Sequence, residues 1–447
     1  IAILKYSKEE DIMKRFLLII LALAMMLSCG AWTDISASAE SLTRKNISAS
    51  NTSSKNGEIR DITTMELVRD MGYGINLGNT FEACGDWING KTPDDYQKAW
   101  GSPVVTEKMI KTYADAGFGV LRIPVAWSNM MSNDGKYTIS SEYAARVKEV
   151  VDWTLNSGMY AIINIHWDNG WVNDFPKNEK ESMKRYKTMW KQIAKIFENY
   201  SDKLIFESQN EELGWDSIWN PWGGTQEQKK LSYDLANRVN QAFVDVIRSG
   251  GGNNPKRHLL ISGYNTGIDR TCDELFKMPK DPANRMAVSV HYYTPSTFCL
   301  LSEDADWGKA VTKWGSQKDL SELDTNMKML KQSFIDKDIP VIVGEYGCYG
   351  DNKSRELKEY WMMTVSKAMY DIGACPILWD TPGGECDRAN CRFSDPEFIK
   401  KLIAPSKTAK LTDNEKANTN DKDNKTDKKT TNKTTKKKKT VKKTFNK

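Results

Sequence analysis

Two glutamates stand where a pair of carboxylates could work together. Glu211 comes shortly after the apolar run 204–208, and Glu345 ends the apolar run 340–345. Cleaving a glycosidic bond requires one carboxylic acid to protonate the leaving oxygen and a second carboxylate to attack carbon or to activate water. The attacking group must be ionised, while the donor must keep its proton near neutral pH. The two glutamates are therefore candidates for acid–base and nucleophilic chemistry.

Neighbouring residues would decide which carboxylate carries the charge. Arg122, if it lies beside Glu345, would keep that carboxylate ionised by charge pairing, and Tyr293 could orient it by a hydrogen bond. The pKa of Glu211 would then be raised by the nearby negative charge. Glu212 is a rival for the acid role. Because adjacent residues of a strand point to opposite faces, we favour Glu211.

Polar and aromatic residues recur where apolar runs end, which is typical of a site at one end of a sheet. They are Asn79 after the first run, His166 in the third, Asn210 after the fourth, His291 in the sixth and Trp379 in the eighth. The chain has only 3 histidines, and two stand at such ends. A metal site made of these two and a glutamate is an alternative. No H-E-x-x-H or H-x-H cluster supports it, and we expect no metal.

Short apolar runs alternate with longer stretches of helical period, which predicts parallel strands separated by helices. The runs are 72–77, 119–125, 160–166, 204–208, 258–262, 286–291, 340–345 and 376–379, and the helical stretches are 106–116, 141–155, 181–200, 226–248, 320–335 and 354–372. Eight such units fit an α/β fold of the (β/α)8 barrel type, whose working residues lie at the carboxyl ends of the strands. An open doubly wound sheet would need a G-x-G-x-x-G turn after its first strand, and none is present.

Several motifs together resemble the family 5 glycoside hydrolases. They are Leu-Arg-Ile-Pro-Val at 121–125, Ile-Phe-Glu-Ser-Gln-Asn-Glu at 205–211, His-Tyr-Tyr at 291–293 and Val-Gly-Glu-Tyr-Gly at 343–347, with Gly-Ile-Asn-Leu-Gly-Asn-Thr at 74–80 and Ile-Leu-Trp-Asp at 377–380. The resemblance extends over about residues 60–404. No single motif is specific, but the combination is.

The resemblance implies roles for the matching residues. Glu211 would be the acid/base, and Glu345 would be the nucleophile supported by Arg122 and Tyr293. It also implies that Asn210 binds the 2-hydroxyl of the sugar at the cleavage point, that His166 and His291 line the same subsite, and that Trp379 forms its stacking floor. Family members retain anomeric configuration, which predicts carboxyl groups about 5–5.5 Å apart.

This chain departs from the family pattern at two positions. Trp167 stands where many relatives have a second histidine, and Glu212 stands where many have proline. Neither change removes a reacting group, so substrate preference is less certain than reaction type. Tryptophans in the expected loops after strands one, three and four are candidates for distal sugar subsites: Trp87, Trp171, Trp215, Trp219 and Trp222. We expect two of them to stack on substrate and the others to pack within the protein.

The two ends differ in composition from the middle of the chain. Residues 1–39 are predicted to be upstream residues and a signal peptide, with a lipoprotein anchor at Cys29 as the less favoured alternative. Residues 40–59 are predicted to be a disordered spacer, and 60–404 the catalytic domain. Residues 405–447 form a predicted disordered Lys/Thr/Asn-rich tail with a net charge of +10, against +5 for the whole chain. The basic character therefore belongs to the tail and indicates no nucleic-acid ligand.

Cysteine usage indicates no metal site. The chain has 8 cysteines, and those that follow the signal peptide show no C-x-x-C spacing. Cys386 and Cys391 are close enough in sequence for one local disulfide if the compartment is oxidising.

These features predict a secreted, extracellular bacterial endo-β-1,4-glucanase that cleaves cellulose-like or mixed-linkage glucans. We expect a monomer with no cofactor, no nucleic-acid partner and no membrane association in its mature form, and with a tail that could bind an anionic cell wall. Xyloglucanase, licheninase and mannanase are alternatives, since loops set specificity. A carbohydrate-binding barrel that has lost catalysis is the alternative from another class, but it should lack one of the site residues.

Overall fold

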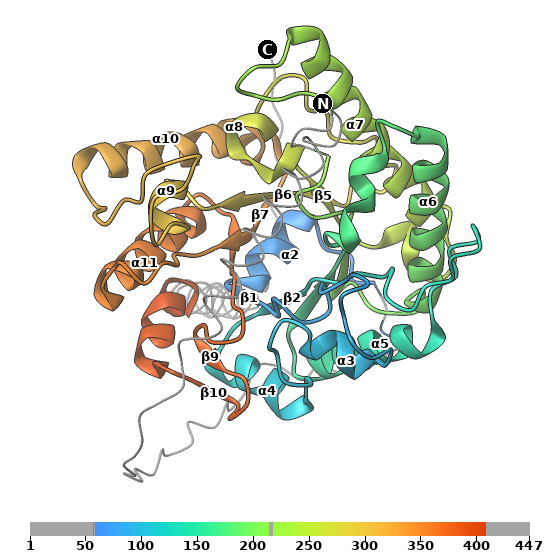
Figure 1. Cartoon of the computed structure of the whole chain (residues 1–447), viewed down its shortest axis with the longest axis horizontal. Coiled ribbons are helices and arrows are strands. Elements are labelled where there is room, and N and C mark those ends of the chain that lie inside the picture. Colours follow the sequence, from blue (N-terminus) through green and yellow to red (C-terminus); the bar gives the residue numbers. More distant parts are fainter. Residues whose placement is uncertain (1–56, 58, 214–217, 408–447) are drawn as a thin grey trace, which may run out of the picture. The chain divides into compact units, whose positions relative to one another are not determined.

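The computed structural model describes residue 57 and residues 59–213 and 218–407. Within these residues, eight parallel strands close into a barrel in which each strand pairs with the next and β8 pairs with β1. Helices surround the barrel (Figure 1). The predicted (β/α)8 fold is therefore confirmed. The predicted signal peptide, nearly all of the spacer and the tail beyond residue 407 lie outside the described residues.

Each strand overlaps one of the predicted apolar runs. The strands are β1 (Gly74–Asn76), β2 (Val120–Ile123), β3 (Tyr160–Ile163), β4 (Leu204–Glu207), β5 (Leu259–Ser262), β6 (Met286–Tyr292), β7 (Val341–Tyr346) and β8 (Cys375–Leu378). Every residue of these strands is buried except the first of β6. Continuous burial is typical of barrel strands, which are covered by helices outside and by packed side chains inside.

The six predicted helices are all present with small shifts at their ends. They are α4 (Glu107–Ala116), α5 (Ser141–Asn156), α6 (Glu179–Ile196), α7 (Gln226–Arg248), α10 (Gln317–Ser333) and α11 (Arg355–Asp371). Shorter elements were not predicted: α2 (Thr64–Met71), α3 (Pro93–Lys98), α8 (Ile268–Thr271), α9 (Ser296–Cys299) and the hairpin of β9 (Cys386–Asp387) with β10 (Arg392–Phe393). They are too short to show a clear apolar period.

Capping residues define where the helices begin and end. Thr225 precedes α7, and its hydroxyl accepts the backbone N–H of Gln228, while the Gln228 side chain accepts the backbone N–H of Thr225. This capping box satisfies N–H groups that have no partner inside the first turn. Gly117 ends α4 with a φ of 103°, a conformation that residues with a β-carbon avoid.

An apolar plug closes the end of the barrel opposite the predicted site. Leu67, Val68 and Met71 of α2 form one buried cluster with side chains from the strands, among them Ile162. A β-carbon on Gly119, just before β2, would lie 1.9 Å from the carbonyl oxygen of Met71. Only glycine therefore allows the helix to approach the strand so closely. The plug leaves the carboxyl ends of the strands as the open mouth.

Cys386 and Cys391, the pair predicted to form a disulfide in an oxidising compartment, are free thiols in this structure, as are the other described cysteines. The register of the hairpin places Cys386 opposite Phe393 rather than opposite Cys391. The Cys391 thiol instead donates to the carbonyl oxygen of Arg388 at 3.6 Å.

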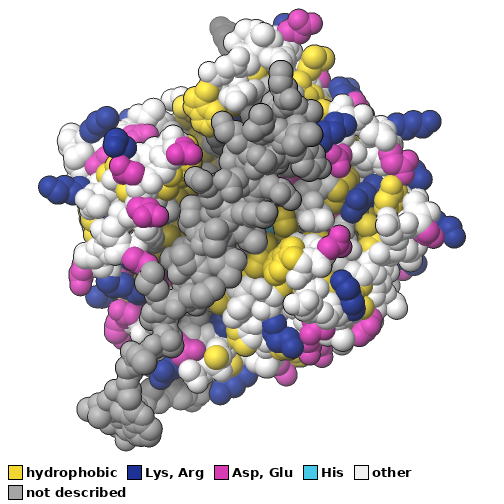
Figure 2. Space-filling view, in the orientation of Figure 1, with side chains coloured by type: hydrophobic (Ala, Val, Ile, Leu, Met, Phe, Trp, Pro, Cys, Tyr) yellow, Lys and Arg dark blue, Asp and Glu magenta, His cyan; other side chains and the backbone are white. Residues whose placement is uncertain are grey.

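Two surface properties bear on possible membrane and charge interactions of the described residues. No helix among the described residues is long and apolar enough to cross a bilayer. On the face shown in Figure 2, acidic and basic side chains are intermingled around the periphery.

Candidate active site

The barrel brings the two predicted carboxylates together at its mouth. Glu345 lies in β7 with its side chain 7% exposed, and Glu211 lies in the loop after β4 with its side chain 43% exposed. His291 joins them: its Nδ1 is 2.6 Å from Glu211 Oε1 and 3.6 Å from Glu345 Oε2. One carboxylate oxygen of each glutamate and one ring nitrogen of His291 lie within 4.8 Å of one another. At least one oxygen of each carboxylate therefore lies within 4.8 Å of the other carboxylate, a short approach in comparison with the ~6.5–9.5 Å between carboxyl groups that hold a water between them.

Arg122 is the centre of the hydrogen-bond network under Glu345. Its Nη1 donates to Glu345 Oε1 at 2.8 Å, its Nη2 donates to Asn210 Oδ1 at 2.9 Å, and its Nε donates to Glu207 Oε2 at 2.7 Å. The guanidinium is fully buried. Burial would lower the pKa of Arg122, but the charges of Glu207 and Glu345 more than offset it and raise that pKa. Arg122 is thus a permanent buried cation that fixes Glu345 and Asn210.

The partners of this cation include residues that sequence reasoning missed. Glu207 also accepts hydrogen bonds from Asn164 Nδ2 at 2.9 Å and Ser289 Oγ at 2.8 Å. Asn76 accepts from Arg122 Nη1 at 3.0 Å. Because strand residues alternate in direction, polar residues inside otherwise apolar strands were the available signal. The network satisfies the charge and the amides that the barrel interior buries.

Tyr293 supports Glu345 as predicted. Its hydroxyl donates to Glu345 Oε2 at 2.8 Å, while Arg122 occupies Oε1 of the same carboxylate. Both oxygens of Glu345 thus accept a hydrogen bond, whereas Glu211 receives neither of these two donors. This asymmetry distinguishes the carboxylates without reference to any relative.

The two carboxyl groups differ in what acts on their charge. Burial raises the pKa of Glu345, although His291, Arg122 and Tyr293 oppose that shift. Burial also opposes ionisation of Glu211, but the hydrogen bond from His291 prevails, and the pKa of Glu211 lies below its usual value. In the unliganded site, the ionised state of Glu211 therefore depends on its hydrogen bond with His291.

His166 and Trp379 form one wall of the site. Their rings are stacked, with centroids 5.8 Å apart and planes within 10° of each other. Burial, with the nearby charge of Arg122, lowers the pKa of His166 well below its usual range. This imidazole is consequently neutral at neutral pH. The Tyr349 hydroxyl donates to the Trp379 carbonyl oxygen at 2.5 Å, which holds the tryptophan backbone in place.

The contact of Asn79 that the structure shows is made by its backbone. Its N–H donates to the Glu82 carboxylate, which also accepts the N–H of Thr80 at 2.8 Å. The φ of Asn79 is 54°, a turn conformation that asparagine tolerates. A role of its side chain in substrate binding remains a prediction.

The loop tryptophans divide into packed and exposed residues. Trp171 and Trp219 are 7% and 8% exposed. The first donates to Asp168 Oδ2 at 2.6 Å, and the second packs against two tyrosines. Trp87 and Trp222 are 45% and 73% exposed. Trp215 lies outside the described residues.

An aromatic row that the sequence did not reveal runs between the loops after β1 and β3. Trp87 stacks on Trp100 with centroids 6.3 Å apart and an interplanar angle of 17°. Trp100 in turn lies 5.8 Å from Trp167, the residue found in place of the family's second histidine. These three residues, here named the tryptophan row, begin next to His166. Flat rings of this kind stack on the apolar faces of sugars.

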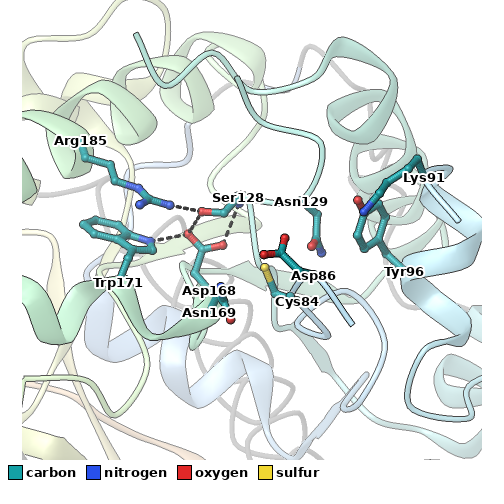
Figure 3. Close-up of a pocket in the computed structure, with 11 residues that line it drawn as sticks. Cys84, Asp86, Lys91, Tyr96, Ser128, Asn129, Asp168, Asn169, Trp171 and Arg185 are labelled. Atoms are coloured by element: carbon teal, nitrogen blue, oxygen red, sulfur yellow. Dashed lines mark hydrogen bonds between the residues drawn. The ribbon is translucent and has the colours of Figure 1, made fainter. Parts of the chain in front are cut away.

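A separate polar pocket of about 160 Å³ lies among the loops after β1, β2 and β3 (Figure 3). Asp168 accepts the backbone N–H and the hydroxyl of Ser128 at 2.7 and 2.6 Å, and Arg185 donates to the same hydroxyl. The guanidinium of Arg185 also covers the Trp171 ring at 4.3 Å. These contacts join the three loops to α6. Neither Glu211 nor Glu345 lines this pocket.

Comparison with known proteins gives a consistent result. The family model for cellulase (glycosyl hydrolase family 5) matches residues 79–382. This chain belongs to glycosyl hydrolase family 5. Endoglucanase A of Ruminococcus albus is 36% identical over 366 residues, which cover 79% of this chain and 95% of that protein. A xyloglucan-specific endo-β-1,4-glucanase of Bacteroides ovatus is 36% identical over 344 residues, covering 73% of this chain and 66% of that protein.

A solved structure agrees with the same family. The GH5-4 broad-specificity endoglucanase of an uncultured bovine rumen ciliate superposes with a TM-score of 0.69 at 35% identity, covering 78% of this chain and 99% of that one. The family 5 chain described here is accordingly a glycoside hydrolase, and its predicted family and enzyme class are confirmed.

Glu212, which stands where many family 5 relatives have proline, is a buried carboxyl group next to Glu211. Its carboxyl is buried, and Oε1 accepts the backbone N–H of Trp167, whereas Oε2 has no hydrogen-bond partner among the described residues. Burial raises the pKa of Glu212 to about 8. Glu212 is thus a neutral acid at neutral pH that binds the backbone of Trp167, whereas Glu211 is the carboxylate that hydrogen-bonds His291.

We expect Glu212→Gln to make stability less sensitive to rising pH. The unfolded carboxyl ionises near 4.5 while the folded one stays protonated up to about 8. Between these values the wild type therefore loses about 1.4 kcal/mol of unfolding free energy per pH unit, and below 4.5 it loses none. Glutamine cannot ionise, so the melting temperature of the variant relative to wild type should rise from pH 5 to pH 8. Thermal unfolding at four pH values measures this difference.

The control for this prediction is Glu274→Gln, which changes an exposed glutamate. Its melting temperature should follow the wild type at each pH. Parallel profiles for Glu212→Gln and wild type would show that Glu212 is ionised in the folded protein.

Proposed function

We propose that this protein is a secreted endo-β-1,4-glucanase that hydrolyses cellulose-like or mixed-linkage β-glucans with retention of configuration. The observation that carries the proposal is the asymmetric pair at the mouth. Glu211 and Glu345 lie close enough for double displacement, and of these two carboxylates only Glu345 accepts hydrogen bonds from Arg122 and Tyr293. A short separation leaves no room for water between carboxylate and sugar, which favours direct attack by a carboxylate.

In the first step, a carboxylate oxygen of Glu345 attacks the anomeric carbon while Glu211 protonates the leaving glycosidic oxygen. The buried cation Arg122 is present in every state and keeps Glu345 ionised. Glu211 is exposed to the cleft, so a bound sugar would displace water from it and raise its pKa. Substrate binding thus gives Glu211 its proton, although its pKa in the empty site is low.

In the second step, Glu211 acts as a base. Glycosylation neutralises Glu345, which removes one negative charge beside Glu211 and leaves it ionised. It then takes a proton from the water that attacks the anomeric carbon, and Glu345 leaves as a carboxylate. Asn210, fixed by Arg122, is placed to bind the 2-hydroxyl of the sugar during both steps. The two glutamates complete the reaction without a cofactor.

The choice of substrate rests on the mouth of the barrel and on the relatives. The tryptophan row, in which Trp87 is exposed and Trp100 and Trp167 are partly buried, starts beside His166 and suits a linear chain of several sugars, as an endo-acting enzyme requires. Similar proteins include an endoglucanase, a broad-specificity endoglucanase and a xyloglucan-specific enzyme. Xyloglucan is therefore the second candidate substrate. The predicted signal peptide supports secretion, and the basic tail supports attachment to an anionic cell wall.

The test is hydrolysis of carboxymethyl cellulose, barley mixed-linkage glucan, xyloglucan and mannan by the full chain. We expect release of reducing ends from the first two, with a rapid fall in viscosity that marks internal cleavage. Proton NMR of early products should show the β-anomer before mutarotation. Early α-anomer would exclude the retaining mechanism, and activity on xyloglucan or mannan alone would replace the proposed substrate. Deleting residues 408–447 should reduce cell-wall binding and leave hydrolysis unchanged.

We expect Trp100→Ala to weaken the binding of long oligosaccharides. Removing the middle ring of the tryptophan row should cost about 1–1.5 kcal/mol, or roughly 10-fold in KM for cellohexaose, with kcat little changed. An aryl β-cellobioside is too short to cover the row and should be cleaved normally. Steady-state kinetics on both substrates measures the difference. Trp153→Ala on the outer helix α5 is the control, and equal effects on both substrates would remove the row from the substrate path.

A further inference from the structure

Two cysteines connect the loops that follow β6 and β7. Cys299 ends α9 in the first loop, and Cys348 lies in the second, shortly after Glu345. Their side chains share a hydrogen bond, and they are 0% and 5% exposed. The backbone N–H of Tyr349 also donates to the carbonyl oxygen of Cys299 at 2.7 Å. The two thiols are thus held in contact by backbone as well as by side chains.

The remaining described cysteines show no comparable pairing. Cys391 donates to a backbone carbonyl oxygen, and Cys386 faces the Tyr113 hydroxyl. A disulfide requires two sulfur atoms that can approach bonding distance without movement of the backbone. The side chains of Cys299 and Cys348 interact directly although the residues are far apart in sequence, and the Tyr349 N–H to Cys299 carbonyl hydrogen bond joins the backbones of their two loops.

We propose that Cys299 and Cys348 form a disulfide bond that joins the β6 and β7 loops beside the catalytic carboxylate Glu345. The bond is a covalent modification of the thiol state that the structure records. It goes beyond the hydrolytic function and does not depend on which glucan is cleaved.

The surroundings favour Cys348 as the attacking sulfur. The hydrogen bond from Cys299 and the positive charge of Lys353 lower the pKa of Cys348. Lys353 is fixed there, since its Nζ donates to the Leu301 carbonyl oxygen at 2.9 Å. A thiolate is the nucleophile in thiol–disulfide exchange. Cys348 is thus the thiol of the pair that more readily forms the thiolate needed for oxidation to a disulfide.

The reaction uses a low-molecular-weight disulfide such as oxidised glutathione as the oxidant. The Cys348 thiolate attacks one of its sulfurs and expels a thiolate, which forms a mixed disulfide. Cys299 loses its proton to solvent and attacks the Cys348 sulfur, which expels the second thiolate. Two protein thiols are oxidised, and one small disulfide is reduced to two thiols. Because both cysteines are buried in the closed loops, the exchange takes place as the loops close, when Cys299 and Lys353 already lie beside Cys348.

The cross-link would stiffen the support of the active site. The β6 loop begins at Tyr293, which binds Glu345, and the β7 loop contains Tyr349, which binds the backbone of Trp379. Cys348 is the neighbour of Tyr349 in the chain. A bond at Cys299 therefore restrains the nucleophile's hydrogen-bond donor and the stacking floor together. It also reduces the entropy of the unfolded chain, which raises stability.

The direct test maps the linkage in the wild-type chain. Full-length protein is refolded from denaturant in a mixture of reduced and oxidised glutathione, remaining thiols are alkylated, and the chain is cleaved with trypsin. Cleavage at Lys and Arg gives peptides 286–309 and 338–353, each with one of the two cysteines. Mass spectrometry should detect these peptides joined, and reduction should separate them. Their recovery only as alkylated single peptides would overturn the proposal, as would an equal yield of the Cys386–Cys391 linkage.

A second test measures stability in the oxidised and reduced states. Dithiothreitol should lower the melting temperature of the oxidised wild type by several degrees and leave Cys299→Ala unaffected. Cys391→Ala is the matched control and should respond to reductant as the wild type does. A wild type that is insensitive to dithiothreitol would contradict the proposal, and the peptide map decides the question even if Cys299→Ala fails to fold.

Discussion

Replacing Glu345 by glutamine is expected to lower kcat on β-glucan by at least about 10⁴-fold, or roughly 5 kcal/mol of transition-state stabilisation. The amide cannot form the bond to the anomeric carbon, so the first chemical step has no nucleophile. Its oxygen can still accept from Arg122 Nη1, and its amino group can donate to Tyr293, so the fold should persist. Reducing-sugar kinetics together with a melting curve would separate lost chemistry from lost structure.

A smaller side chain at the same position provides the outcome that identifies the role. Glu345→Ala leaves space on the face from which the carboxylate attacked, and added azide can enter there. With an activated aryl β-cellobioside, this variant should form the α-glycosyl azide. Glu212→Gln serves as the neighbouring-carboxyl control for Glu345→Gln and should keep its activity. Glu345→Gln activity within tenfold of wild type, or a β-azide from Glu345→Ala, would refute the assignment of the nucleophile.

Replacing Glu211 by glutamine should have an effect that depends on the leaving group. On β-glucan the leaving oxygen needs a proton, and loss of the general acid should reduce kcat by about 10²–10⁴-fold. On an aryl β-cellobioside with an acidic phenol, Glu345 can displace the phenolate unaided. The glycosyl–enzyme then accumulates, because no base activates water. We expect a rapid burst of phenol followed by slow turnover, measured by stopped-flow absorbance.

The stereochemistry of azide rescue separates Glu211 from Glu345. In Glu211→Ala, the glycosyl–enzyme on Glu345 would be attacked by azide from the opposite face, which gives the β-glycosyl azide. The two alanine variants should thus produce opposite anomers from one substrate. An equal loss of activity on glucan and on the aryl substrate, without a burst, would show that Glu211 is not the acid/base.

The residues at strand ends were predictable because a barrel places every strand's carboxyl end at one mouth. Glu211, Glu345, Arg122, Tyr293 and His291 were all named from their positions beside apolar runs, and the structure brings them into contact. Strand order along the chain and the polarity of each strand end suffice for such a prediction. Neither requires knowledge of loop conformation.

Glu207 shows where this reasoning stops. It ends the apolar strand Leu-Ile-Phe-Glu and was passed over as part of a buried run. Its importance arises from Arg122 on β2, which it contacts across the barrel interior. Such a contact exists only once the sheet has closed, since closure directs the inward-facing side chains of separate strands toward one another.

The loop residues were the least predictable. Trp171 and Trp87 look alike in sequence, yet the first is packed under Arg185 and the second is half exposed beside Trp100. Cys299 likewise meets Cys348, whereas the closer pair in sequence, Cys386 and Cys391, does not bond. Loop conformation depends on contacts among several distant segments, and local sequence does not encode those contacts in a form that periodicity reveals.

The sequence by itself determined the barrel, the order of its strands, the two glutamates proposed for catalysis and the family, because hydrophobic period and strand-end polarity are local properties. Only the tertiary structure decided the short distance between the carboxylates and the fact that Arg122 and Tyr293 bind Glu345 but not Glu211. It also decided the neutral buried state of Glu212, the tryptophan row and the contact between Cys299 and Cys348. Each of these depends on burial or on distance between residues remote in the chain, and both are set when the barrel closes and its loops pack.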